Sequence, residues 1–265
     1  MSYVDLHLHL LPGVDDGARD LAQSLEHAER MVRDGVREAT VTPHVGPIWP
    51  LAVAAIAART AQLQRAIDER GLDLTLHAGA EIHARHAGRL ADAELDLVAQ
   101  GPPGARWILF EVPFEGIDTA FAGACAELRA RGFGVVIAHP ERAAGLLDGG
   151  LRLLEPALGA GAALQVNVCS LLGRHGAEAQ RAGEWLLRRG LARVLASDGH
   201  PAGRRQTLAD GVTAATAAGL SAAQARRLVD ANPRLLLRRG LPAGANRPLA
   251  RRRRPRRAAQ PASVS

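Results

Sequence analysis

The segment Asp5-Leu6-His7-Leu8-His9 is the most informative part of this chain. It continues the apolar start at Tyr3 and has the pattern of a buried strand with polar side chains at its end. Because successive strand residues point to opposite faces, His7 and His9 project to the same side. Two imidazoles at one strand end either satisfy local hydrogen bonds or bind a metal ion, and the rest of the sequence decides between these possibilities.

Short apolar runs alternate with longer amphipathic stretches along the chain. The predicted strands cover residues 3–8, 39–42, 72–78, 107–112, 134–138, 163–168 and 194–197. The predicted helices run from Leu21 to a stop at Gly35 and over 51–70, 120–131, 177–189, 206–218 and 221–230. This alternation implies parallel strands, in either a barrel or a doubly wound sheet. Polar residues follow nearly every strand instead of one switch point, which favours a barrel.

The composition predicts one catalytic domain and a short basic tail. A chain of 265 residues with 47% hydrophobic content can bury the core of one α/β barrel. The net charge of +6 comes from residues 243–265, which hold seven Arg and no acids, whereas residues 1–242 hold 26 Arg against 27 acids. The domain at 1–242 is therefore nearly neutral, and nucleic acid is not an expected partner. The Arg- and Pro-rich tail is predicted to be disordered, with weak contact to an anionic membrane surface as an alternative.

Cysteine usage and hydropathy indicate a reduced, cytoplasmic protein. The two cysteines, Cys125 and Cys169, lie in apolar segments, and no secretion signal precedes the first strand. Apolar runs reach about eight residues, well short of the roughly 20 that span a bilayer. Cys125 and Arg131 formally fit the Cys-x5-Arg string of cysteine-dependent phosphatases. The segment lacks glycine and continues a helix, so we reject that reading.

Nine imidazole and carboxylate groups lie at or just after the ends of the predicted strands. Such groups are costly to bury together unless divalent cations compensate them. Nine ligands exceed the needs of one ion, so the sequence predicts two or three metal ions with a bridging carboxylate. Manganese, iron and zinc all accept this mixture of nitrogen and oxygen ligands. The nine candidates are His7, His9, Asp16, His44, Glu81, Glu111, His139, Asp198 and His200.

Five segments carry a resemblance to a known family. They are 7–17 (HLHLLPGVDDG), Thr42-Pro43-His44, Gly79-Ala80-Glu81-Ile82, His139-Pro140-Glu141-Arg142 and Ser197-Asp198-Gly199-His200. In this order they resemble bacterial polymerase-and-histidinol-phosphatase (PHP) domains. More narrowly they resemble the manganese-dependent protein-tyrosine phosphatases that accompany bacterial tyrosine kinases in capsule and exopolysaccharide operons. The resemblance extends to about Leu241 and implies a distorted (β/α)7 TIM-like barrel.

The resemblance also implies roles for the candidate residues. One metal would be held by His7, His9, Glu81 and Asp198, with Glu81 bridging to a second held by Glu111 and His139. Asp16, His44 and His200 would hold a third. Asp15 remains an alternative to Asp16 as the ligand. Arg142 and Arg205 would clamp the phosphate, although Arg204 beside Arg205 makes the second choice ambiguous.

The expected reaction is hydrolysis of a phosphomonoester by metal-bound hydroxide, without a covalent phosphoenzyme. The resemblance implies a phosphotyrosine protein as substrate, with a bacterial tyrosine kinase as the expected partner. A histidinol phosphatase or another small-molecule phosphoesterase would use the same metal ligands. A PHP nuclease module and a non-catalytic, metal-dependent scaffold are further alternatives.

Overall fold

The computed structural model describes residues 2–49, 51–201 and 203–244. In this part of the chain all paired strands run parallel, in two sheets with the orders β1-β2-β4 and β3-β5-β6-β7-β8-β9. The strands are β1 (Tyr3–Leu8), β2 (Val36–Val41), β3 (His44–Val45), β4 (Thr75–Ala78), β5 (Glu81–His83), β6 (Trp107–Glu111), β7 (Gly134–Ala138), β8 (Ala163–Asn167) and β9 (Ala192–Ala196).

Two of the strands are interrupted. β2 leads into β3 across Pro43, which has no N–H to donate, and β4 leads into β5 across Gly79. A Cβ atom on Gly79 would lie 2.6 Å from Thr40 Cγ2, so only glycine allows this close approach. Backbone bonds cross the break, since the Glu81 amide donates to the Pro43 carbonyl over 3.1 Å. The described part of the chain therefore forms seven strands, two of them broken, and the predicted α/β fold is confirmed.

The barrel closes where β1 meets the end of β9. Leu8 pairs with Gly199 in a parallel bridge, and the His9 amide donates to the Gly199 carbonyl over 3.0 Å. The Asp198 amide donates to the His7 carbonyl over 2.9 Å. This closure brings the first and last of the predicted metal-binding motifs together.

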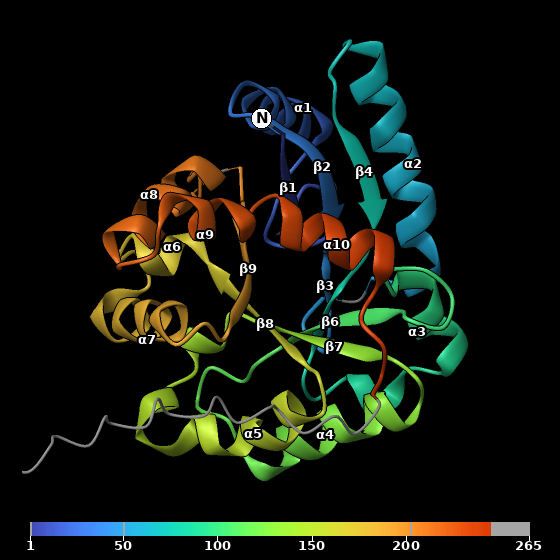
Figure 1. Ribbon diagram of the computed structural model, residues 1–265. Helices are drawn as coiled ribbons and strands as arrows, with labels where there is room; N and C mark the ends of the chain where they lie inside the picture. The colour runs from blue at the N-terminus through green and yellow to red at the C-terminus, as the bar shows by residue number, and fades with distance from the viewer. Residues whose placement is uncertain (1, 50, 202, 245–265) are drawn as a thin grey trace, which may run out of the picture.

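Helices surround the strands, as Figure 1 shows for α2, α4, α5 and α7. The six predicted helices are confirmed within a few residues as α1, α2, α4, α7, α8 and α9, whereas α3, α5, α6 and α10 were not predicted. Their bounds are α1 (Leu21–Arg33), α2 (Val53–Glu69), α3 (Asp92–Val98), α4 (Thr119–Ala130), α5 (Leu151–Gly159), α6 (Val168–Leu171), α7 (Gly176–Arg188), α8 (Leu208–Ala217), α9 (Ala222–Arg227) and α10 (Ala231–Arg239). Three short turns are η1 (Ala87–Arg89), η2 (Pro140–Arg142) and η3 (Leu146–Gly150).

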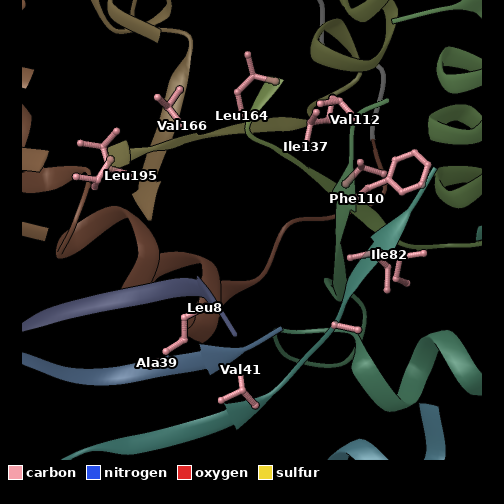
Figure 2. Close-up of a cluster of buried hydrophobic side chains, with 14 of the residues drawn as sticks. Leu8, Ala39, Val41, Ile82, Phe110, Val112, Ile137, Leu164, Val166 and Leu195 are labelled. Carbon is pink, nitrogen blue, oxygen red and sulfur yellow. The ribbon is translucent and has the colours of Figure 1, made fainter. Parts of the chain in front are cut away.

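Alternating strand residues build two apolar clusters. The outer cluster lies between strands and helices. Figure 2 shows part of it, with Phe110, Ile137 and Leu195 among the labelled side chains. The inner cluster contains Trp107 and Leu236, and the Trp107 indole donates to the Leu236 carbonyl over 3.1 Å. Helix α10 thus covers the barrel interior at the N-terminal ends of the strands, and the polar groups lie at the C-terminal ends.

Three further expectations from the sequence concern Cys125, membrane-spanning helices and the C-terminal tail. Cys125 is fully buried within α4, and this burial raises the pKa of its thiol to about 12, unlike a reactive thiolate. No helix within the described ranges is long and apolar enough to span a bilayer. The predicted division after residue 242 and the disorder of the tail stay predictions, because residues 245–265 lie outside the described part.

Candidate metal centre

His7 and His9 reach the barrel interior through an irregularity in β1. Leu6 packs in the inner apolar cluster but Leu8 packs in the outer one. The register of β1 against β2 shifts between Asp5 and Leu8, which accounts for the change of side. The Nε2 atoms of His7 and His9 consequently lie 3.3 Å apart, and both side chains are buried. The predicted shared orientation of the two imidazoles is confirmed.

Four imidazoles surround the carboxylate of Glu81, the first residue of β5. Its Oε2 atom lies 3.2 Å from His7 Nε2, 3.4 Å from His9 Nε2 and 3.1 Å from His44 Nδ1. Its Oε1 atom lies 2.7 Å from His139 Nε2. Burial disfavours the charged form, but these imidazoles hold the pKa of Glu81 well below its usual value. The two oxygens of Glu81 thus face different imidazoles, an arrangement that a bridging carboxylate requires.

Asp198 follows β9 and faces two kinds of partner. Its Oδ1 atom lies 3.7 Å from His7 Nε2 and 3.4 Å from His9 Nε2. Burial alone would raise the pKa of Asp198, but His7, His9 and Arg204 hold this pKa well below its usual value. Among the described non-glycine residues, only Asp198 (φ 49°) and His139 (φ 33°) have left-handed backbones. Such strain is stored at functional sites more than elsewhere, and both residues here turn side chains into the cluster.

The structure separates Asp15 from Asp16. Asp16 Oδ1 lies 3.1 Å from His200 Nε2 and 3.4 Å from His44 Nε2, on the cluster side. Asp15 instead lies behind His9, where its Oδ2 atom is 2.7 Å from Nδ1 and also accepts the His44 amide. Asp15 thus orients the ring of His9, whose Nε2 atom is turned to the cluster. The geometry favours Asp16 as the ligand.

Glu111 stands slightly apart from the other candidates. It is buried at the end of β6, and within the described ranges its carboxylate has no hydrogen bond or ion pair. Burial and the nearby charge of Glu81 raise the pKa of Glu111 to about 8. A cation beside it would offset both effects. The role of Glu111 as a ligand stays a prediction.

The arrangement fits divalent ions. Eight of the nine predicted ligands fall into overlapping groups of three whose ligand atoms lie within 4.8 Å of one another. Buried imidazole nitrogens beside ionised carboxylates are the donors that manganese, iron and zinc accept. How the ligands divide among ions stays a prediction. The groups are His7-His9-Asp198, His7-Glu81-His139, His9-His44-Glu81 and His9-Asp16-His200.

Two arginines reach the cluster, and one differs from the sequence-based choice. Arg142 and Arg204 place NH1 3.4 Å and 2.6 Å from Asp198 Oδ2. Arg205 instead donates to the Pro201 carbonyl and lines a separate small cavity. The geometry therefore favours Arg204 over Arg205 as the second phosphate-binding arginine, and the role of either residue stays a prediction. The physical reason is local, because backbone bonds in both directions between His200 and Arg204 fix which of the two adjacent side chains faces inward.

A row of polar side chains lies behind the cluster, and no role was predicted for it from the sequence although Gln165 and Asn167 belong to the family resemblance. Gln165 Oε1 lies 3.0 Å from His7 Nδ1, and Gln165 Nε2 donates to Asn167 Oδ1 over 2.7 Å. Asn167 Nδ2 then donates to Asp198 Oδ2 over 2.7 Å. If His7 donates its Nδ1 proton to Gln165, its Nε2 lone pair is free for a metal. The signal was present as two polar residues alternating within the predicted strand 163–168.

A second missed group supports Arg142. The buried carboxylate of Glu141 accepts from the Ser170 hydroxyl over 2.8 Å and from the Asn167 amide over 2.9 Å. Ser170 Oγ also lies 3.0 Å from His175 Nδ1. Burial raises the pKa of Glu141 to about 7. These bonds tie η2, which carries Arg142, to the start of α6.

Gln165→Met is expected to lower metal affinity about 10- to 100-fold, since it keeps the side-chain size but removes the partner that orients His7. Calorimetric titration with Mn²⁺ measures this. Gln64→Met is the matched control, because Gln64 bonds only Asp68, Leu74 and Leu76 in the part of the chain that is described. Unchanged affinity in a folded Gln165→Met variant would contradict the proposed orientation of His7.

Comparisons with known proteins place the chain in a family. The profile of the capsular polysaccharide synthesis family CpsB/CapC matches residues 3–238. The chain is 31% identical to tyrosine-protein phosphatase YwqE of Bacillus subtilis over 201 residues, 74% of this chain and 77% of the relative. It is 27% identical to the putative tyrosine-protein phosphatase CapC of Staphylococcus aureus over 198 residues, 74% of this chain and 76% of that protein.

Solved structures agree in fold. One of the structures of YwqE from Bacillus subtilis and CpsB from Streptococcus pneumoniae, described as metal-dependent tyrosine phosphatases, matches with TM-score 0.76 and 28% identity, over 94% of this chain and 100% of the other. Histidinol phosphate phosphatase of Lactococcus lactis matches with TM-score 0.52 and 15% identity, over 83% and 95% of the two chains, a likeness of fold alone. The chain belongs to the CpsB/CapC family of capsular polysaccharide synthesis.

Proposed function

We propose that this protein is a metal-dependent protein-tyrosine phosphatase that acts in capsule or exopolysaccharide synthesis. The observation that carries the proposal is the convergence of buried imidazoles and ionised carboxylates around Glu81, beside two arginines. Membership of the CpsB/CapC family and the names of the relatives support phosphotyrosine as the substrate. The preferred metal is manganese, as expected from the resemblance.

The residues of the cluster have distinct tasks in this proposal. His7, His9, Asp16, His44, Glu81, Glu111, His139, Asp198 and His200 would hold the ions. When bound, such ions supply a nucleophile from water near neutral pH and offset charge on the phosphate. No side chain of the chain needs to attack phosphorus, which agrees with the absence of a reactive thiol at Cys125.

Arg142 and Arg204 bind the phosphate in this account. Each guanidinium contacts Asp198 Oδ2 through NH1 and has further N–H groups left for phosphate oxygens. Asn167 fixes the same carboxylate oxygen, so both arginines are anchored to one rigid group. This anchoring orients them before substrate binds, which favours stabilisation of the charge that develops in the transition state.

The proposed partner is a phosphotyrosine protein, specifically a bacterial tyrosine kinase. This partner, manganese as the native ion and a cytoplasmic location stay predictions from the sequence.

Substrate choice separates the proposal from its nearest rival. We expect kcat/KM for a phosphotyrosine peptide to exceed that for histidinol phosphate and for nucleotides by at least about tenfold. Steady-state phosphate release by the metal-loaded enzyme measures all three. A preference for histidinol phosphate would replace the proposed substrate and keep the metal site. If the metal-loaded, folded protein hydrolysed none of these substrates, the result would favour the alternative of a non-catalytic, metal-dependent scaffold.

A further inference from the structure

A pocket of about 290 Å³ opens directly beside the metal cluster. His44 and Glu111 belong to the pocket wall and to the predicted ligand set at the same time, so pocket and cluster are continuous. The remaining wall comes from two loops at the C-terminal ends of strands, residues 46–49 after β3 and residues 112–115 after β6, together with His83. The pocket is therefore placed to receive whatever is attached to a phosphate at the cluster.

Two aromatic residues link the pocket to the phosphate-binding groups. The Trp49 ring stacks on His44 with centroids 6.4 Å apart and planes 9° from parallel. The Phe114 ring lies 4.2 Å from the guanidinium carbon of Arg142 and 5.7 Å from the His139 ring. Each aromatic side chain thus contacts a residue of the cluster or the arginine clamp from a different loop.

Several apolar side chains of the pocket are exposed to solvent, although contact with water is unfavourable for them. Ile48 is 75% exposed and Phe114 is 43% exposed at the rim. Pro47, Val112 and Pro113 add further apolar surface to the lining. Contiguous exposed apolar groups beside a polar site indicate ligand binding, and burying them against an aromatic ring is favourable.

We propose that this pocket is an aryl subsite that holds the phenyl ring of a phosphotyrosine side chain between the loops of Trp49 and Phe114. The inference rests on the proposed phosphatase function and adds the residues that select the substrate. The cluster and the two arginines recognise the phosphate of any phosphomonoester. The pocket adds affinity only for an ester whose leaving group is a flat apolar ring, because a short aliphatic chain leaves Trp49 and Ile48 uncovered.

Binding of non-hydrolysable phosphonates to the metal-loaded full-length protein tests the subsite without depending on turnover. Calorimetry is expected to give a Kd for phenylphosphonate at least about tenfold lower than for methylphosphonate. Trp49→Ala should raise the phenylphosphonate Kd about tenfold and change the methylphosphonate Kd less than about twofold. Trp185→Ala is the matched control, because Trp185 lies on α7 and stacks with Arg189 outside the pocket.

A second variant covers the case in which Trp49→Ala does not fold. Phe114→Leu keeps an apolar wall but removes the ring, and it should weaken phenylphosphonate selectively as well. Equal Kd values for the two phosphonates in the wild type, or equal weakening of both in the variants, would overturn the aryl subsite. Tighter binding of 2-aminoethylphosphonate than of phenylphosphonate would also overturn it and assign the pocket to an ammonium group near Glu111 and Glu115. Hydrolysis of a phosphotyrosine peptide by the wild type is a separate measurement, so failure of the proposed function is distinguishable from failure of the subsite.

Discussion

Glu81→Gln is expected to lower kcat/KM at least about 10³-fold and to reduce bound metal, because no other side chain within the described residues faces as many of the candidate ligands. The amide keeps the size of the side chain but removes the negative charge that four imidazoles surround. Loss of several kcal/mol of transition-state stabilisation corresponds to this factor. Metal analysis and steady-state kinetics on the same preparation measure both effects.

Glu141→Gln is the matched control for this substitution. Glu141 is as buried as Glu81 but bonds Ser170 and the backbone of Asn167 instead of the imidazoles. Its variant should keep the wild-type metal content even if it lowers stability. If Glu81→Gln retained full metal content and activity, the central position of Glu81 in the metal site would be wrong.

Arg204→Ala is expected to lower kcat/KM about 10²- to 10³-fold, whereas Arg205→Ala should stay within about threefold of wild type. The difference follows from geometry: of these two adjacent arginines, Arg204 contacts Asp198, whereas Arg205 donates to the Pro201 carbonyl. Metal content should be unchanged in both variants, which separates loss of phosphate binding from loss of ions.

The two arginine variants differ by one position in sequence, so each serves as the control for the other. A large loss in Arg205→Ala together with a normal Arg204→Ala would restore the sequence-based choice. Circular dichroism on both proteins excludes unfolding as the cause.

Much of the fold could be predicted from the sequence because its signals are local. Apolar runs of strand length, amphipathic helices and polar residues after nearly every strand lead to a parallel barrel. The two strand breaks were missed, because Pro43 and Gly79 interrupt pairing through backbone geometry that hydropathy does not express. Helix α10 was missed for a similar reason, since the packing of Leu236 beneath Trp107 is a long-range contact.

Site residues could be predicted where the residue type allows few roles. They could not be predicted where the direction of the side chain decides which of two neighbours faces the cluster. Several His and Glu side chains at the ends of buried strands have few explanations besides metal binding. This allowed the candidates to be chosen from the sequence, and eight of the nine lie together in the structure. Asp15 and Asp16 are chemically identical neighbours, and only the fold shows that one orients His9 while the other faces His200. The same limit applies to the adjacent residues Arg204 and Arg205, of which only the fold shows that Arg204 faces the cluster. Gln165 and Asn167 are neutral, so their support of His7 and Asp198 follows only from their contacts.

The decisive measurement is metal content together with activity on the same preparation. The purified protein should contain two or three divalent ions per chain, lose phosphatase activity on chelation, and regain it when Mn²⁺ is added back. Undiminished hydrolysis of a phosphotyrosine peptide by protein shown to be free of metal would contradict the account.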